Sequence, residues 1–171
     1  EAGTCTNAAL LTAIAAAGSG GTVYICPGRY TGTMTLHSDV SLIGAGAGED
    51  QTEDTILDAL SSGTVVSIPN GPTIGLRQLH ITGGRTTAIG PGAGINHLGA
   101  LLSMTDCTVS NNHTVANQEM AEARGAIVNG GLSQLVMTRC TVRNNSTTNT
   151  AVMAAFAAGG IGWSCAFVFA S

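Results

Sequence analysis

Charged side chains are scarce in this chain of 171 residues. They account for 9% of it, and lysine is absent, so that all six basic residues are arginines. Soluble domains carry about 25% charged residues. Because the net charge is −4, the chain lacks the basic surface that binds a nucleic-acid backbone. We therefore expect no nucleic-acid partner.

Aromatic residues are also few, at 4%, which leaves little material for stacking on bases or sugars. The four histidines are not spaced with a second ligand in the manner of a transition-metal site. The glycine-rich stretches at 44–48 and 90–94 have no lysine to complete a phosphate-binding loop. These absences argue against the commonest nucleotide and transition-metal sites.

The chain is instead rich in small and uncharged residues, namely glycine, threonine, serine, asparagine and alanine. Five cysteines in such a chain indicate an oxidising compartment. The opening "EAGTCTNAALL" resembles a secreted protein whose signal peptide has been removed, so we expect an extracellular or cell-surface location. Three sequons make the following asparagines candidates for glycosylation: Asn112, Asn144 and Asn145.

The main pattern is an internal repeat, which has to be interpreted first because it decides the fold. "LLSMTDCTVSNN" at 101–112 and "QLVMTRCTVRNN" at 134–145 carry apolar residues at the same offsets, followed both times by two asparagines. "TIGLRQLHITGG" at 73–84 repeats the apolar positions and ends on two glycines. Each copy has two short alternating runs separated by a two-residue spacer.

Alternation with a period of two predicts strands, and the spacer predicts a bend after which the apolar residues still point inward. Glycine and asparagine at the ends tolerate left-handed backbone, and stacked asparagines can hydrogen-bond along the repeat. No helical pattern separates the strands. The repeat therefore predicts an all-β fold, a parallel β-helix of about five or six coils in which neighbouring coils bury each other's apolar faces.

The N-terminal stretch differs from the repeat. "TCTNAALLTAIAAAGSGG" predicts a short helix with Thr4 or Thr6 as its N-cap and Gly18 at its end, and an apolar stripe of Leu10, Leu11 and Ile14. We expect one domain over 1–171: a capping helix within 1–20, coils over 21–150, and an apolar final coil or assembly strand over 151–171. A disulfide between Cys5 and Cys26 would join the cap to the first strand.

The duplicated Met and Cys are predicted to stack in pairs inside the coils, Met104 on Met137 and Cys107 on Cys140. Neighbouring strands lie about 4.8 Å apart, which is within the Cα separation that a disulfide accepts. Cys107 and Cys140 are thus either a bridge or two buried thiols. Stacked side chains point the same way, which is poor disulfide geometry and favours the free thiols.

These motifs resemble a known family. "GGTVYICPGRYTGTMTL", "SLIGAGAGEDQTEDTILDAL" and "IGLRQLHITGG" are similar to the opening of right-handed β-helix proteins of the pectin-lyase-like superfamily. "MTDCTVSNN" resembles the coils of secreted bacterial β-helix repeat proteins. The resemblance implies a right-handed coil. It implies no single activity, because the superfamily includes polysaccharide lyases, hydrolases, adhesins and surface proteins of unknown role.

Lyases of the superfamily carry a lateral groove with several carboxylates, usually binding calcium, and a basic residue. The one acidic cluster here is "GEDQTED", and calcium needs several converging oxygens. A solvated loop is the simpler interpretation, with calcium as the alternative. The candidate calcium ligands are Glu49, Asp50, Glu53 and Asp54.

Hydrolases of the superfamily carry three aspartates on adjacent coils with a histidine and a basic residue. The aligned coil positions here hold Gln78, Asp106 and Arg139, so the set has one carboxylate and no second one for an acid–base pair. An ion pair between Asp106 and Arg139 is the simpler interpretation. If the chain is an enzyme, the candidate catalytic residues are Arg77, His80, Asp106 and Arg139.

The last stretch, 151–170, contains no charged residue. Its length suits a membrane span, but its glycines and alanines and the lack of a basic flank argue against one. A β-helix that ends on an apolar strand has to dock or join another copy. Cys165, the odd cysteine, also suggests a link between chains. The predicted assembly residues are Trp163, Cys165, Phe167, Val168 and Phe169.

Two classes of function follow. The first is a non-catalytic extracellular building block that associates head-to-tail into a surface fibre, with copies of itself as partners and no cofactor. The second is a pectin-lyase-like carbohydrate-active enzyme, a lyase or glycoside hydrolase, or a module that binds surface glycans. A fragment of a larger surface protein would also explain the uncapped end.

Overall fold

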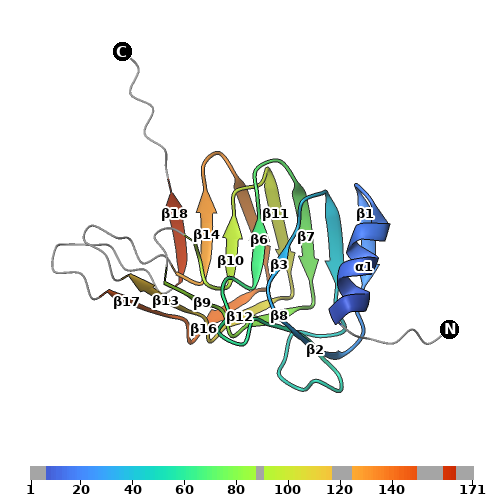
Figure 1. Ribbon diagram of the computed structural model, residues 1–171, viewed down its shortest axis with the longest axis horizontal. Helices are drawn as coiled ribbons and strands as arrows, with labels where there is room; N and C mark the ends of the chain where they lie inside the picture. Colours follow the sequence, from blue (N-terminus) through green and yellow to red (C-terminus); the bar gives the residue numbers. More distant parts are fainter. Residues whose placement is uncertain (1–6, 88–90, 117–124, 150–159, 165–171) are drawn as a thin grey trace, which may run out of the picture.

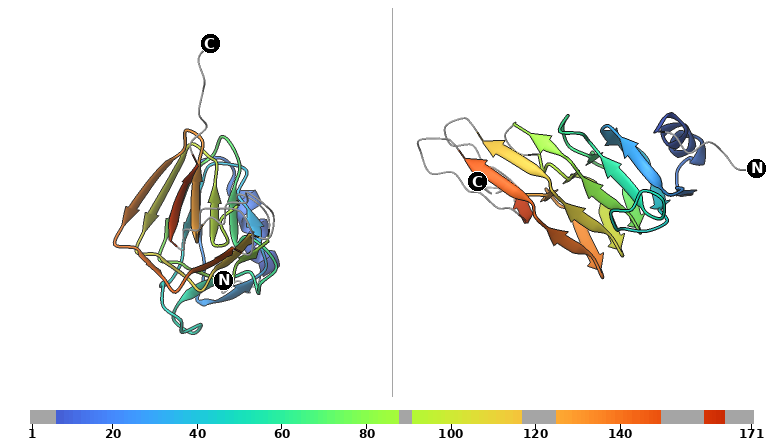
Figure 2. Two further views of the ribbon diagram at one scale, coloured as in Figure 1. Left: turned by 90° about the vertical axis from the view of Figure 1, so that its left-hand side faces the viewer. Right: turned by 90° about the horizontal axis from the view of Figure 1, so that it is seen from below.

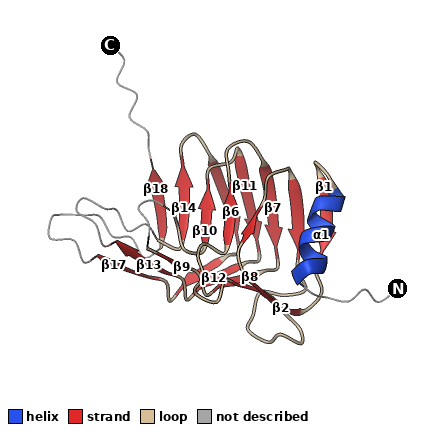
Figure 3. Ribbon diagram, viewed as in Figure 1, coloured by secondary structure: helices blue, strands red, loops and turns tan. Residues whose placement is uncertain are grey.

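The computed structural model describes residues 7–87, 91–116, 125–149 and 160–164. The chain forms a β-solenoid of about four turns, in which every strand pair is parallel, with one short helix at its N-terminal end (Figures 1 and 3). The predicted all-β parallel coil is confirmed. The predicted five or six coils are too many, because a coil here takes up to 34 residues, as from Leu42 to its register partner Leu76.

The helix α1 (Asn7–Ala17) precedes the strands, which follow in chain order around the solenoid. The first two turns contain β1 (Gly21–Tyr24), β2 (Gly28–Thr31), β3 (Met34–Thr35), β4 (Val40–Ile43), β5 (Thr55–Asp58) and β6 (Val66–Ile68). The next two contain β7 (Thr73–Arg77), β8 (His80–Thr82), β9 (Arg85–Thr86), β10 (Ile95–His97), β11 (Leu101–Thr105), β12 (Thr108–Ser110), β13 (His113–Ala116) and β14 (Ile127–Gly130). The last strands are β15 (Gln134–Thr138), β16 (Thr141–Arg143), β17 (Ser146–Asn149) and β18 (Ile161–Ser164).

Stacked strands make the walls of the solenoid, which enclose the core (Figure 2). One wall, sheet A, has the order β1-β4-β7-β11-β15, and the next, sheet B, has β2-β5-β8-β12-β16. A third has β3-β6-β10-β14-β18, and β9-β13-β17 form a short fourth. The register pairs Leu102 with Leu135 and Met104 with Met137, as the sequence repeat predicts.

The spacer between the two runs of each repeat is a bend. The second residue of the spacer has a left-handed backbone in three successive coils, with φ of 53° at Gln78, 54° at Asp106 and 51° at Arg139. A second left-handed column follows one strand later at Gly83, Asn111 and Asn144. Glycine and asparagine occupy this second column because they adopt the left-handed region at low cost.

A ladder of asparagine side chains lies behind the second bend. The Asn112 side chain is 1% exposed; its Oδ1 accepts from the Gly84 amide at 2.9 Å, and its Nδ2 donates to the Ser110 carbonyl at 2.9 Å. Asn145 repeats the arrangement, because its Oδ1 accepts from the Asn112 amide at 3.0 Å. The predicted hydrogen bonding of stacked asparagines is confirmed.

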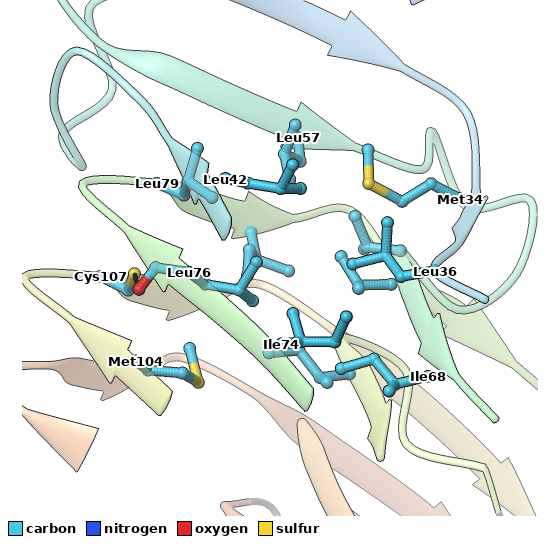
Figure 4. Close-up of a cluster of buried hydrophobic side chains, with 14 of the residues drawn as sticks. Met34, Leu36, Leu42, Leu57, Ile68, Ile74, Leu76, Leu79, Met104 and Cys107 are labelled. Atoms are coloured by element: carbon cyan, nitrogen blue, oxygen red, sulfur yellow. Dashed lines mark hydrogen bonds between the residues drawn. The ribbon is translucent and has the colours of Figure 1, made fainter. Parts of the chain in front are cut away.

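The core is a set of apolar columns that run along the solenoid. Leu42, Leu76 and Met104 form one of them and are each at most 1% exposed (Figure 4). Burial of a side chain of this size stabilises a fold by about 1.5–3 kcal/mol relative to an exposed one. The columns end at the last coil, where Met137 and Leu135 are only partly buried.

The helix α1 covers the first coil, as the sequence predicts. Leu10 and Ile14 are 5% and 9% exposed and belong to the core, and Gly18, with a φ of 66°, ends the helix. Leu11 was predicted to share this buried stripe but is 49% exposed. The prediction for Leu11 is wrong because an 11-residue helix on a narrow coil buries one side only.

The described part of the C-terminal segment contains β18, which pairs in parallel with β14. This strand lies within the final coil or assembly strand expected over 151–171, and the residues after Ser164 lie outside the described residues. Among the described residues no helix is long and apolar enough to span a membrane.

Candidate functional site

The candidate catalytic residues do not form one site. Asp106 and Arg139 face each other across the bend between sheets A and B, with Arg139 Nε and Nη2 donating to the carboxylate at 2.6 and 2.8 Å. This hydrogen bond, followed by the charges of Arg139 and Arg77, lowers the pKa of Asp106. The predicted cross-coil ion pair is confirmed, and it lies exposed at a corner of the solenoid.

His80 has different partners. It lies on the outer side of β8 and is 2% exposed. One ring nitrogen, Nδ1, lies 2.6 Å from the Gly48 carbonyl, and the other, Nε2, lies 2.7 Å from Ser110 Oγ. Because a carbonyl only accepts, Nδ1 carries the proton and Nε2 accepts from the Ser110 hydroxyl. Burial lowers the pKa of His80, so the ring is neutral at pH 7.

The loop 44–54 covers His80 and so accounts for the burial of this outer face. Its Glu49 accepts from Arg143 Nη2 at 2.8 Å, across a sequence separation of 94 residues. The Gly48 carbonyl and the Glu49 carboxylate thus attach the loop to β8 and β16. The loop is a lid over the middle of sheet B.

The carboxylates of this loop were the candidate calcium ligands, and the structure separates them. Glu49 is paired with Arg143, and Asp50 Oδ1 accepts from the amide and hydroxyl of Thr52. Asp54 Oδ2 accepts from the Asp50 amide at 3.1 Å. Glu53 is exposed. Among the described residues, no group of three or more His, Cys, Asp or Glu side chains is arranged to hold a metal ion.

The Ser110–His80–Gly48 chain has the order of a nucleophile, a base and a group that orients the base. Ser110 is 0% exposed, however, so its hydroxyl is not accessible to a substrate. The three groups act as a polar attachment for the loop. Each buried polar atom of the attachment has a partner, which is what burial requires.

Sequence reasoning identified His80 but missed its surroundings. Ser110 and Arg143 follow the repeat's last apolar position, and nothing in the pattern distinguishes them from other outward residues. Asp58, paired with Arg29, was also missed. The register places Asp58, Thr82 and Ser110 in one outward column of sheet B. A search for polar residues directly after the last inward apolar residue of each coil would have found this column.

The last coil is a second candidate surface, which we call the tail. Its strands β15, β16, β17 and β18 each lie at the end of their sheet. The inward side chains of this coil are not fully covered, and Ile161 is 40% exposed. The partly buried members are Leu135, Met137, Cys140 and Val142.

The predicted assembly residues of this end are placed only in part. The Trp163 backbone pairs with Asn129 in the register of β18 and β14. Cys165, Phe167, Val168 and Phe169 lie outside the described residues, so their role stays a prediction.

The outer side of α1 is the matching surface at the other end, which we call the head. The helix "NAALLTAIAAA" has no charged residue and is apolar around most of its circumference. Its outer side, away from Leu10 and Ile14, carries Thr12, Ala15 and Ala16 and is exposed, as is Leu11 on the flank of the helix. A helix that is apolar all round is normally buried on all sides. The composition of α1 therefore predicts that its outer side is also covered, whereas this side is exposed.

The two described cysteines of the repeat are free thiols, which is the alternative that the sequence favoured. Cys107 and Cys140 carry free thiols, and Cys107 is buried whereas Cys140 is half-buried. Burial raises the pKa of Cys107 to about 12. The bridge between Cys5 and Cys26 stays a prediction, because Cys5 lies outside the described residues.

The candidate glycosylation sites differ in exposure. Asn112 is 1% exposed and its amide is engaged in the ladder, so the folded chain offers no nitrogen for a glycan there. Asn145 is half-buried, and its Nδ2 donates to the Val109 carbonyl at 2.9 Å. Asn144 is exposed and is the one of the three that the fold leaves accessible.

Comparison of the chain with protein-family models, with curated proteins and with solved structures gives no match.

Proposed function

We propose that the chain is a non-catalytic, extracellular structural protein whose copies stack head-to-tail into a fibre. The observation that carries the proposal is that, among the described residues, each end of the solenoid has a partly exposed apolar surface. The tail is the last coil with its partly exposed Leu135, Met137 and Ile161. The head is the outer side of α1.

The two surfaces are complementary in kind. The inner side of α1 already packs on the open face of the first coil through Leu10 and Ile14. The tail presents the same kind of face, because each coil repeats the apolar columns of the one before it. A second copy's α1 can therefore cover the tail with its outer side, as its inner side covers its own first coil.

Head-to-tail contact joins two different surfaces, so it generates an open chain of copies rather than a closed pair. A side chain moved from exposed to buried contributes about 1.5–3 kcal/mol. Several partly exposed residues on each side would then offset the cost of association, which is at least about 4 kcal/mol.

Sedimentation velocity over a concentration series tests the proposal. The wild-type chain is expected to form species larger than a monomer that grow with concentration. Leu11→Lys at the head and Met137→Lys at the tail are each expected to weaken association at least tenfold. Leu98→Lys is the matched control, because Leu98 is 40% exposed on the side of the solenoid.

Two outcomes would contradict the proposal. A wild-type chain that stays monomeric at every concentration would exclude self-association. Equal weakening by Leu98→Lys would show that association does not use the ends.

A glycan-binding role is the second candidate. The outer face of sheet A has an open groove of about 550 Å³, with Ser41, Gly75 and Ser103 along its floor and Asp39 at its edge. Small polar side chains leave room for a flat, hydroxyl-rich ligand, and Tyr24 on the same face is 78% exposed. Under this second candidate role, we propose that the chain is a member of the pectin-lyase-like superfamily and that its coil is right-handed.

A glycan array with the wild-type chain and with Ser103→Leu tests this role. The half-buried, outward Ser103 lies on the groove floor, so leucine there would fill the groove without touching the core. Binding that Ser103→Leu removes would favour this candidate. Absence of any binding would remove it.

A further inference from the structure

Cys107 and Cys140 stack in parallel on consecutive coils. Cys107 follows β11 and Cys140 follows β15, and the Thr141 amide donates to the Cys107 carbonyl at 2.8 Å. Each thiol donates to the carbonyl two residues earlier, Cys107 to Thr105 at 3.4 Å and Cys140 to Thr138 at 3.4 Å. Because both side chains have the same orientation, their sulfurs are separated by about the spacing of stacked strands, roughly 4.8 Å.

Parallel side chains at this spacing are poorly placed for a disulfide, whose sulfurs have to approach to about 2.05 Å. It suits an ion held between the sulfurs in a straight line. Zinc–thiolate bonds are about 2.3 Å long, and bonds of this order put the two sulfurs of a linear site about 4–5 Å apart. The coil repeat sets this separation without any rearrangement.

The surroundings select the kind of ion. Cys107 lies in the apolar core beside Met104, which is 0% exposed (Figure 4), and the half-buried Cys140 packs against the same core. No carboxylate or imidazole in the described residues joins them in a larger group, so a hard or four-coordinate ion finds too few ligands here. Thiolates with few other ligands favour Cu(I) among the biological metals.

We propose that Cys107 and Cys140 bind one Cu(I) ion as a two-coordinate, linear site that joins the last two coils. Each thiol releases one proton as its sulfur–copper bond forms, and no electron is transferred. The two thiolates and the ion together carry one negative charge. The half-buried Cys140 provides the entry for the ion and leaves one side of the site open to water.

The test is a titration of the full chain, without oxygen, with the coloured Cu(I)–bicinchoninate complex. The wild-type chain is expected to take one Cu(I) from the competitor. Cys107→Ser and Cys140→Ser are each expected to lower the affinity at least 100-fold. Cys165→Ser and Met104→Leu are the controls and are expected to bind as the wild type does.

X-ray absorption at the copper edge then has to show two sulfur neighbours, with bonds shorter than those of a four-coordinate thiolate site. Three or more sulfur neighbours, or wild-type affinity in Cys140→Ser, would overturn the proposal. A copper-treated chain that loses two hydrogens by mass and binds no copper would also overturn it, because the thiols would then have formed a disulfide. If Cys107→Ser fails to fold, Cys140→Ser decides alone, since Cys140 lies at the half-buried end.

Discussion

Substitution of Asn112 by alanine tests whether the asparagine ladder holds the coils together. The change removes the acceptor of the Gly84 amide at 2.9 Å and the donor to the Ser110 and Ile81 carbonyls at 2.9 and 3.2 Å. A buried amide without a partner costs about 1–3 kcal/mol, and each lost hydrogen bond about 1 kcal/mol more. We expect a loss of about 4 kcal/mol in the free energy of unfolding.

For a chain of this size 1 kcal/mol shifts the melting temperature by about 2–4 °C, so Asn112→Ala should melt about 8–16 °C lower. Circular dichroism of a dilute sample measures this. Asn144→Gly is the matched control, because Asn144 is exposed, has a φ of 54° and can be replaced by glycine at little cost. A melting temperature for Asn112→Ala equal to that of Asn144→Gly would refute the ladder as a source of stability.

Three further predictions follow from burial. His97 is 0% exposed, its Nδ1 lies 2.6 Å from Asn129 Oδ1 and its Nε2 has no partner. Burial lowers the pKa of His97 in the folded chain, so as the pH falls the unfolded chain takes up the proton at a higher pH than the folded chain does. The free energy of unfolding therefore decreases as the pH drops below about 6.5. Urea unfolding at pH 7.5 and 5 should show this loss, reduced in His97→Gln, and an unchanged pH dependence would contradict it. Met104→Ala should cost about 2–5 kcal/mol and Met137→Ala less than half as much in the same assay, because only Met104 is fully buried; equal costs would show that the tail is covered. Gly84→Ala should melt lower by calorimetry, because its Cβ would lie 1.9 Å from the Ala93 carbonyl oxygen, and an unchanged melting temperature would refute this packing.

The parts of the fold that repeat were predictable from sequence. The matching offsets of Met104 and Met137 gave the strand register, and the paired asparagines gave the ladder. Each of these follows from local spacing, because every coil repeats the same short pattern. The prediction that Leu11 is buried was wrong, because its exposure depends on how much of α1 the first coil can cover.

The lateral lid was not predictable in the same way. The attachment of Glu49 to Arg143 joins residues 94 positions apart, and the loop that makes it has no repeat to align. His80 was found because it lies in the repeat, whereas Gly48 begins the stretch "GEDQTED", for which a solvated loop was the simpler interpretation. Long-range contacts of an irregular loop depend on its three-dimensional path, which local spacing does not encode.

The most direct test of head-to-tail association is to mix the two end variants. Leu11→Lys keeps an intact tail, and Met137→Lys keeps an intact head, so the account predicts that each variant alone is monomeric and that the mixture forms a dimer and nothing larger. Mass photometry of the two samples and of their equimolar mixture measures this. A dimer in Leu11→Lys alone would show that tails pair with tails, and a monomeric mixture would contradict association through the ends.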